Sequence, residues 1–170
     1  MDQPNALTCP DGSDAGITVV PFSVPGKVAL WLEDASQENF GSVAEDTIAL
    51  EIRDSSGATR AFYVPGCASF PPELAERLRG APMVLFDGTL WVNDEMIRDG
   101  VGIKTGDRMG HMSVSGPAGT IAAFADLDVK RKIFIHINTT NPILLDDSPQ
   151  RAEVLAAGWE VSHDGMEITL

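Results

Sequence analysis

Two imidazoles and one carboxylate are the side chains of this sequence best placed for chemistry, and His136 is the first of them. It lies near the carboxyl end of a predicted strand, 132–137, and directly before the polar loop 138–142. Mixed α/β folds bind ligands where strands end in loops, so this imidazole suits a metal ion or a substrate. A core histidine satisfied by a backbone carbonyl fits the same residues.

The loop after His136 and the segment around His111 supply further polar candidates. The side-chain amides of Asn138 and Asn141 can orient a neighbouring ligand. His111 stands in a Gly-His-Met-Ser sequence, where a partly exposed and orientable imidazole suits proton transfer. An ordinary surface-loop histidine is the alternative for His111.

Asp87 has the same strand-end placement as His136, because it directly follows the apolar run 83–86. A carboxylate there can bind a metal, accept a hydrogen bond or cap the next turn. His163 lies beside Asp-Gly in a predicted turn, where we expect a solvated side chain. No His-x-His-x-Asp-His or His-Glu-x-x-His cluster, glycine-rich phosphate loop or Gly-x-Ser-x-Gly elbow is present, so these motifs do not identify a reaction.

Length and charge exclude several classes of protein. The 170 residues fit one domain or part of one. With 12 basic and 25 acidic residues the net charge is −13, which disfavours nucleic acid as a partner. No apolar run approaches the roughly 18 residues of a membrane helix, so we expect no membrane insertion and a cytoplasmic location. Two cysteines, Cys9 and Cys67, are too few for a disulfide framework.

Short β-branched runs separated by turn residues predict a mixed sheet with a few helices, of class α/β or α+β. Residues 1–15 show no periodicity and are expected to form an irregular lead-in to a domain that spans 16–170. The predicted strands are 16–22, 27–32, 47–53, 60–64, 83–86, 132–137, 159–161 and 166–170, and the predicted helices are 73–78, 122–127 and 148–157.

Seven segments, taken in chain order, carry a resemblance to a known family. They are VPGK at 24–27, YVPGCA at 63–68, FDGTLW at 86–91, KTGDRMGHM at 104–112, FIHINTTNP at 134–142, GWEV at 158–161 and DGMEI at 164–168. Together they resemble pyrroloquinoline quinone (PQQ) biosynthesis protein B, a family of the metallo-β-lactamase superfamily. The resemblance runs over 16–170 and covers only the carboxyl-terminal part of that family.

The resemblance implies the carboxyl-terminal half of a four-layer αβ/βα sandwich, whose missing amino-terminal half is then a partner. In that superfamily a histidine corresponds to Lys27, and a bridging aspartate falls near Gly66 or Cys67. Two customary ligands of a dinuclear site are therefore absent, which implies a single metal. His136 matches a customary metal ligand and His111 a histidine that transfers protons near the metal.

The implied activity is oxidation in PQQ biosynthesis. A single divalent metal, Fe(II) with Zn(II) as the alternative, would serve O2-dependent hydroxylation of the tyrosine-derived ring of a small Glu-Tyr precursor. Asp87 acts with His111 in catalysis, and Asn138 with Asn141 shapes the pocket. Two other functions stay open: a carrier of PQQ or its precursor toward the periplasm, and a phosphodiesterase-like hydrolase. The chain alone is expected to be inactive and to hold metal weakly.

Overall fold

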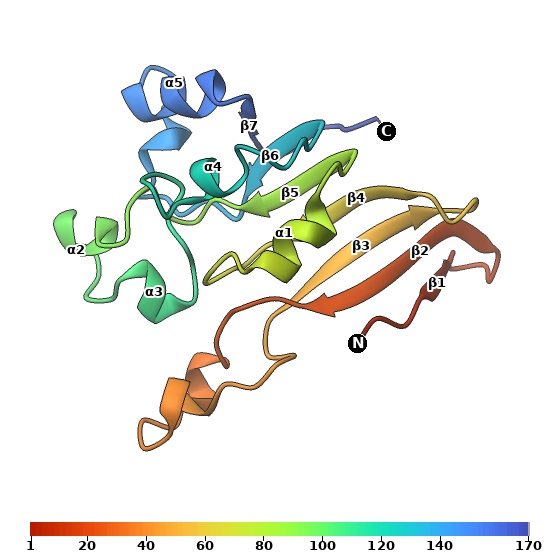
Figure 1. The fold of residues 1–170 in the computed structure, drawn as a ribbon, viewed down its shortest axis with the longest axis horizontal. Helices are drawn as coiled ribbons and strands as arrows, with labels where there is room; N and C mark the ends of the chain where they lie inside the picture. Colours follow the sequence, from red (N-terminus) through yellow and green to blue (C-terminus); the bar gives the residue numbers. More distant parts are fainter. Residues whose placement is uncertain (170) are drawn as a thin grey trace.

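The computed structural model describes residues 1–169 and contains a seven-stranded sheet whose strand order follows the chain (Figure 1). Strands β1 to β4 are antiparallel, and β4 to β7 run parallel to one another. The strands are β1 (Asn5–Thr8), β2 (Asp14–Ser23), β3 (Ile48–Asp54), β4 (Thr59–Val64), β5 (Met83–Asp87), β6 (Arg131–Ile135) and β7 (Trp159–Val161). The mixed α/β class predicted from the sequence is confirmed.

The predicted hairpin is present as β3 and β4, paired in register at Ile52 and Ala61. Its turn is held by the Asp54 carboxylate, which accepts hydrogen bonds from the backbone and hydroxyl of Ser56. Gly57 supplies the positive φ of +82° that this tight reversal needs. Turn chemistry of this kind is local, which is why the sequence predicted it correctly.

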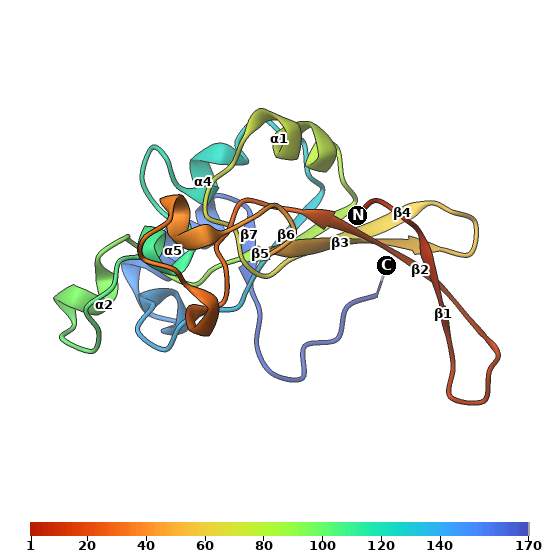
Figure 2. The ribbon, with the colours of Figure 1, turned by 90° about the horizontal axis from the view of Figure 1, so that it is seen from below.

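Helices connect the parallel strands and lie near their carboxyl ends or on one face of the sheet (Figures 1 and 2). α1 begins with a proline in its first turn, and α5 is capped by Ser148, whose hydroxyl accepts from the Arg151 backbone N–H at 3.0 Å. The helices are α1 (Pro72–Leu78), α2 (Glu95–Arg98), α3 (Gly106–Met109), α4 (Thr120–Ala123) and α5 (Pro149–Ala156), with 3₁₀ turns η1 (Leu30–Leu32), η2 (Glu38–Gly41) and η3 (Pro142–Leu144).

Four local predictions need correction. The lead-in is not irregular throughout, because β1 pairs antiparallel with β2. The strand expected at 27–32 is wrong: this segment leaves the sheet, finds no neighbouring strand and ends in η1. The helix expected at 122–127 is the single turn α4. No strand forms over 166–169, and Leu170 lies outside the described residues. In the three cases that concern strands, the presence or absence of a partner strand decided the outcome.

The hydrophobic core lies between the sheet and the helices. Its largest fully buried side chains are the rings of Phe86, Phe124, Phe134 and Trp159. The Phe134 and Trp159 rings stack with centroids 4.0 Å apart. The opposite face of the sheet carries a smaller cluster around Met83 and Ile133, over which the carboxyl-terminal segment packs with Met166 and Ile168 (Figure 2). Within residues 1–169, no helix has the length and apolar character needed to cross a membrane.

Candidate metal centre

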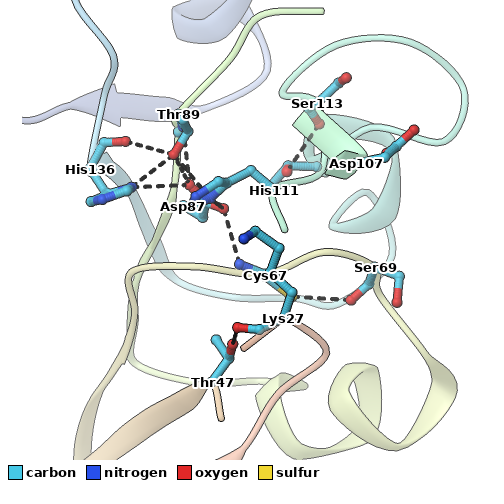
Figure 3. A network of polar contacts seen from close by, with 12 residues as sticks. Lys27, Thr47, Cys67, Ser69, Asp87, Thr89, Asp107, His111, Ser113 and His136 are labelled. Atoms are coloured by element: carbon cyan, nitrogen blue, oxygen red, sulfur yellow. Dashed lines mark hydrogen bonds and ion pairs between the residues drawn. The ribbon is translucent and has the colours of Figure 1, made fainter. Parts of the chain in front are cut away.

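The candidate site forms where the parallel strands β5 and β6 end side by side. Asp87 is the last residue of β5 and is paired in register with Ile135, so His136 follows immediately beside it. His111 arrives from the loop after α3. One ligand atom from each of the three side chains lies within 4.8 Å of the other two. Residues far apart in sequence are thus joined into one donor cluster (Figure 3).

Asp87 is the buried centre of this cluster, with none of its side chain exposed. Its Oδ2 atom accepts from the backbone N–H of Cys67 at 3.0 Å and lies 2.7 Å from His111 Nδ1. Its Oδ1 atom accepts from the Thr89 backbone at 3.1 Å and hydroxyl at 2.5 Å. Burial disfavours the carboxylate, but these hydrogen bonds, that of His111 first, hold the pKa of Asp87 below its usual value.

A tight helix end places His111. α3 has Thr105 as its N-cap and Gly110 as its C-cap, with a φ of +88° at Gly110. A Cβ at Gly110 would also lie 3.1 Å from Lys27 Cγ, so both conformation and space favour glycine there. After Gly110 the chain turns back toward the sheet. Met112, the residue after His111, fixes this turn, because its backbone N–H donates to the Cys67 carbonyl at 2.7 Å. The Gly-His-Met sequence is thus a positioning turn.

His136 has a left-handed backbone, with a φ of +52°, which is uncommon for a residue other than glycine. This conformation ends β6 and leaves the side chain 54% exposed. Its ring stacks on that of His111, with centroids 5.2 Å apart and planes 23° apart. The Asp87 carboxylate, 3.7 Å from His136 Nδ1, raises the pKa of His136. The expected alternative of a buried core histidine does not apply.

A hollow of about 360 Å³ opens beside the two imidazoles. Its lining combines the polar side chains of Thr89 and Asn138 with apolar ones. Such a mixture suits a small ligand that has both a ring and polar groups. The lining residues are Thr89, Met96, Met109, His111, His136, Ile137 and Asn138.

The two predicted asparagines have different surroundings. Asn138 borders the hollow, and its amide donates to Thr140 at 2.8 Å. Asn141 is buried: its amide nitrogen donates to the Gly88 carbonyl at 2.8 Å, and its oxygen accepts from the Ile143 backbone at 3.1 Å. Asn141 therefore holds the loop against β5 and is not among the residues that line the hollow.

Sequence reasoning missed Thr89, whose hydroxyl contacts both imidazoles and Asp87. The signal was available, because an aspartate followed two residues later by threonine is a common self-capping turn. The Cys67 side chain is buried beside the site, and burial raises the pKa of the Cys67 thiol to about 12.

A second ionic cluster lies beside the site and does not enter it. The ammonium of Lys27 pairs with Glu33, and the Arg108 guanidinium holds the same carboxylate with two hydrogen bonds of 3.0 and 2.6 Å. These bonds, that of Arg108 first, lower the pKa of Glu33 to about 2. Arg108 also lies over the Phe40 ring at 3.8 Å. The cluster ties the segment between β2 and β3 to α3, and through α3 to His111.

The donor set fits a divalent transition metal. Imidazoles are typical ligands of zinc and of non-heme iron, whereas magnesium and calcium favour oxygen donors. A carboxylate beside the imidazoles either joins the ligands or orients them. The half-exposed His136 ring borders the hollow, which leaves room for further ligands. Asp87, His111 and His136, singled out from the sequence, are the three residues that the fold brings together.

Comparisons with known proteins agree with the fold. A family model described as "Beta-lactamase superfamily domain" matches residues 2–137. The chain is 57% identical over 169 residues to "Coenzyme PQQ synthesis protein B" of Gluconacetobacter diazotrophicus and 54% identical over 168 residues to the protein of that name from Xanthomonas oryzae pv. oryzae. These matches cover 99% of this chain but only 54% and 55% of the relatives.

A solved structure of the same family has the same fold over the length of this chain. The crystal structure of Zn²⁺-bound PqqB from Methylobacterium extorquens superposes with a TM-score of 0.88 at 44% identity, over 100% of this chain and 54% of that one. The chain therefore spans about half the length of the relatives that it matches. The resemblance drawn from seven short segments is confirmed, including its restriction to part of the family's length.

Proposed function

The chain belongs to the β-lactamase superfamily domain family, and from this we propose that it supplies the metal-binding half of a protein of coenzyme PQQ synthesis. The observation that carries the proposal is the cluster of Asp87, His111 and His136, found in a chain 57% identical to a PQQ synthesis protein. The Zn²⁺ in a similar solved protein supports a divalent metal. We propose Fe(II) for activity, with Zn(II) as the redox-inert alternative.

The roles of the residues follow from their contacts. His136 is half exposed beside the hollow and would hold the metal. His111 is backed by the ionised Asp87 at 2.7 Å, an arrangement that orients the imidazole and strengthens it as a base. Asn138 borders the hollow and offers an amide to a polar substrate. Iron bound there would supply one-electron chemistry toward dioxygen, which none of these side chains can provide.

We propose that the reaction is hydroxylation of the phenol ring of a small Glu-Tyr precursor. One atom of O2 replaces a ring hydrogen as hydroxyl, and the other leaves as water with two protons and two electrons from an external reductant. The apolar wall of Met96, Met109 and Ile137 suits a flat ring, and His111 lies where it can accept a phenol or ring proton.

The remaining length of the relatives would cover the open face of the sheet. Leu50, Tyr63 and Leu85 lie side by side across three strands on the face opposite the helices. The carboxyl-terminal segment packs on the cluster to which Leu85 belongs, whereas Tyr63 is 39% exposed. An apolar row of this kind favours burial against another layer. The purified chain alone should therefore associate in solution. A monodisperse monomer in sedimentation that also unfolds cooperatively in urea would contradict this proposal.

The activity test needs the rest of the domain. The chain is co-expressed with the part of the Gluconacetobacter diazotrophicus relative that it does not match, loaded with Fe(II) or Zn(II) without oxygen, and given a Glu-Tyr dipeptide, ascorbate and O2. We expect a product heavier by one oxygen atom with Fe(II) and no such product with Zn(II). The His136→Ala protein should not form this product, and the His163→Ala protein should still form it, since His163 lies in an exposed turn.

Other outcomes would favour the other functions. Tight binding of PQQ without any product would favour a carrier, and cleavage of a phosphodiester with Mn(II) or Zn(II) would favour a hydrolase. Either result, together with no oxygen uptake above that of the His136→Ala protein, would reject the hydroxylase proposal.

A further inference from the structure

Thr89 is the least expected member of the cluster, because its hydroxyl meets four partners from three parts of the chain. The Oγ1 atom lies 2.5 Å from Asp87 Oδ1, 2.8 Å from His136 Nδ1, 3.2 Å from His111 Nδ1 and 3.0 Å from the His136 carbonyl oxygen (Figure 3). The residue is buried, with 7% of its surface exposed. A hydroxyl with one hydrogen and two lone pairs cannot serve all four partners as a donor.

We propose that Thr89 is a positioning residue that holds the proton of neutral His136 on Nδ1, so that Nε2 is the free ligand atom. This inference rests on the metal site proposed above and goes beyond it by naming the group that orients the ligand.

Counting hydrogens leads to this assignment. The Asp87 carboxylate can only accept, so the Thr89 hydroxyl donates its single hydrogen to Oδ1, its nearest partner. Its lone pairs then face His136 Nδ1 at 2.8 Å, which must carry a hydrogen for the contact to be a bond. Asp87 Oδ1 itself is 3.7 Å from that nitrogen, beyond hydrogen-bond distance. Thr89 is thus the side chain that can accept from His136 Nδ1.

His111 is arranged in a parallel way. Its Nδ1 lies 2.7 Å from Asp87 Oδ2, a carboxylate oxygen that must accept, so His111 Nδ1 carries a hydrogen as well. The two rings stack with an angle of 23° between their planes. Both Nδ1 atoms are thus engaged with Asp87 or Thr89, which leaves the two Nε2 atoms as the free ligand nitrogens of two rings that line the hollow. In this arrangement Asp87 orients the imidazoles and is not itself a third ligand.

Thr89 is also tied to the loop that carries His136. The Thr89 hydroxyl lies 3.0 Å from the His136 carbonyl oxygen, which belongs to the backbone with a φ of +52°. The single hydroxyl hydrogen is already donated to Asp87 Oδ1, so this contact adds no second hydrogen bond. The backbone N–H of Asn138 in turn donates to the Thr89 carbonyl at 3.1 Å. Threonine is stiff at its first side-chain torsion, which favours a fixed hydroxyl position. The Thr89 hydroxyl therefore positions the His136 ring, and the Thr89 backbone holds the loop that follows it.

The test compares four forms of the chain: wild type, Thr89→Val, Thr89→Ser and Thr120→Val. Valine keeps the shape of threonine and removes the hydroxyl, whereas serine keeps the hydroxyl. Thr120 is a matched control, because it is a fully buried threonine whose hydroxyl bonds the Ser113 carbonyl at 3.3 Å, outside the cluster. Histidine ¹⁵N shifts are measured on the metal-free proteins at pH 9, where imidazoles are neutral.

We expect protonated Nδ1 and bare Nε2 for His136 in the wild type, Thr89→Ser and Thr120→Val proteins, and a mixture of the two tautomers in Thr89→Val. Co(II) alone then serves as a spectroscopic probe of the site. Its affinity should fall about 10- to 100-fold in Thr89→Val, as losing the group that orients a ligand does, and stay within about 3-fold in Thr89→Ser.

An unchanged tautomer and an unchanged Co(II) affinity in Thr89→Val would overturn the inference, as would an Nε2-protonated His136 in the wild type. If Thr89→Val does not fold, loss of the Nδ1-protonated form in Thr89→Ser alone decides against it. A shifted tautomer in Thr89→Val together with no Co(II) binding by any form would support the role of Thr89 and reject the proposed metal site.

Discussion

Replacing Asp87 by Asn should destabilise the chain by about 3 kcal/mol at pH 7. The carboxylate accepts from two backbone N–H groups, the Thr89 hydroxyl and His111, and it does so without any exposure to water. An asparagine keeps one acceptor oxygen and turns an NH2 group toward the remaining donors. Two of the four bonds are then lost, at about 1.5 kcal/mol or more for each bond to a charged group.

The pH dependence of this loss has a definite sign. The pKa of Asp87 in the folded chain lies below its ordinary value of 3.8, so the stabilisation by its charge is complete above that value. It is lost as the pH falls below 3.8 toward the folded pKa. Asp87 also raises the pKa of His136, so the difference between wild type and Asp87→Asn should grow as the pH falls through the raised pKa of His136 toward 6.5, and shrink again below 3.8.

Urea unfolding measures this prediction directly. With a slope near 2 kcal/mol per molar, typical of a domain of this size, a loss of about 3 kcal/mol lowers the midpoint by about 1.5 M. Asp128→Asn is the matched control, because Asp128 is exposed and has a φ of +53°, which asparagine tolerates well. We expect the control to change stability by less than about 0.5 kcal/mol. A loss below about 1 kcal/mol in Asp87→Asn with an unchanged slope would refute the reasoning.

Three further predictions concern the scaffold. Glu33→Gln should lower the free energy of unfolding at pH 6. The difference from wild type should disappear as the pH falls from 4.5 through about 2, the folded pKa of Glu33. Acid unfolding monitored by circular dichroism measures this difference. Gly110→Ala, at a φ of +88°, should cost about 1–2 kcal/mol in urea unfolding and disorder His111, visible as broadened ring signals; a sharp, unshifted spectrum would contradict this. Phe134→Ala removes the ring stacked on Trp159 and should cost about 3–5 kcal/mol, and a smaller loss would mean that the core closes over the gap.

The parts of the fold that could be predicted from the sequence are those with local causes. The hairpin over β3 and β4 depends on an aspartate and a glycine within its own turn, and α5 depends on Ser148 at its start. The strand predicted at 27–32 failed because an apolar segment forms a strand only when a partner strand is available. In the structure this segment is instead held outside the sheet by the ion pairs of Glu33 with Lys27 and Arg108.

Some residues of the candidate site could also be predicted from the sequence, and others could not. Asp87, His111 and His136 could be identified from residue type and from their places at strand ends or beside glycine, which are properties of short stretches of chain. Asn141 could not be separated from Asn138, since only packing shows that one is buried against Gly88 and the other borders the hollow.

The sequence by itself determined which residues carry the chemistry, because residue type and neighbouring turn signals act over a few positions. Only the tertiary structure decided that three of them share one cluster and that the Thr89 hydroxyl joins them. The physical reason is that parallel pairing of β5 with β6 sets Asp87 beside residues almost fifty positions away, and short-range propensities contain no information about that register.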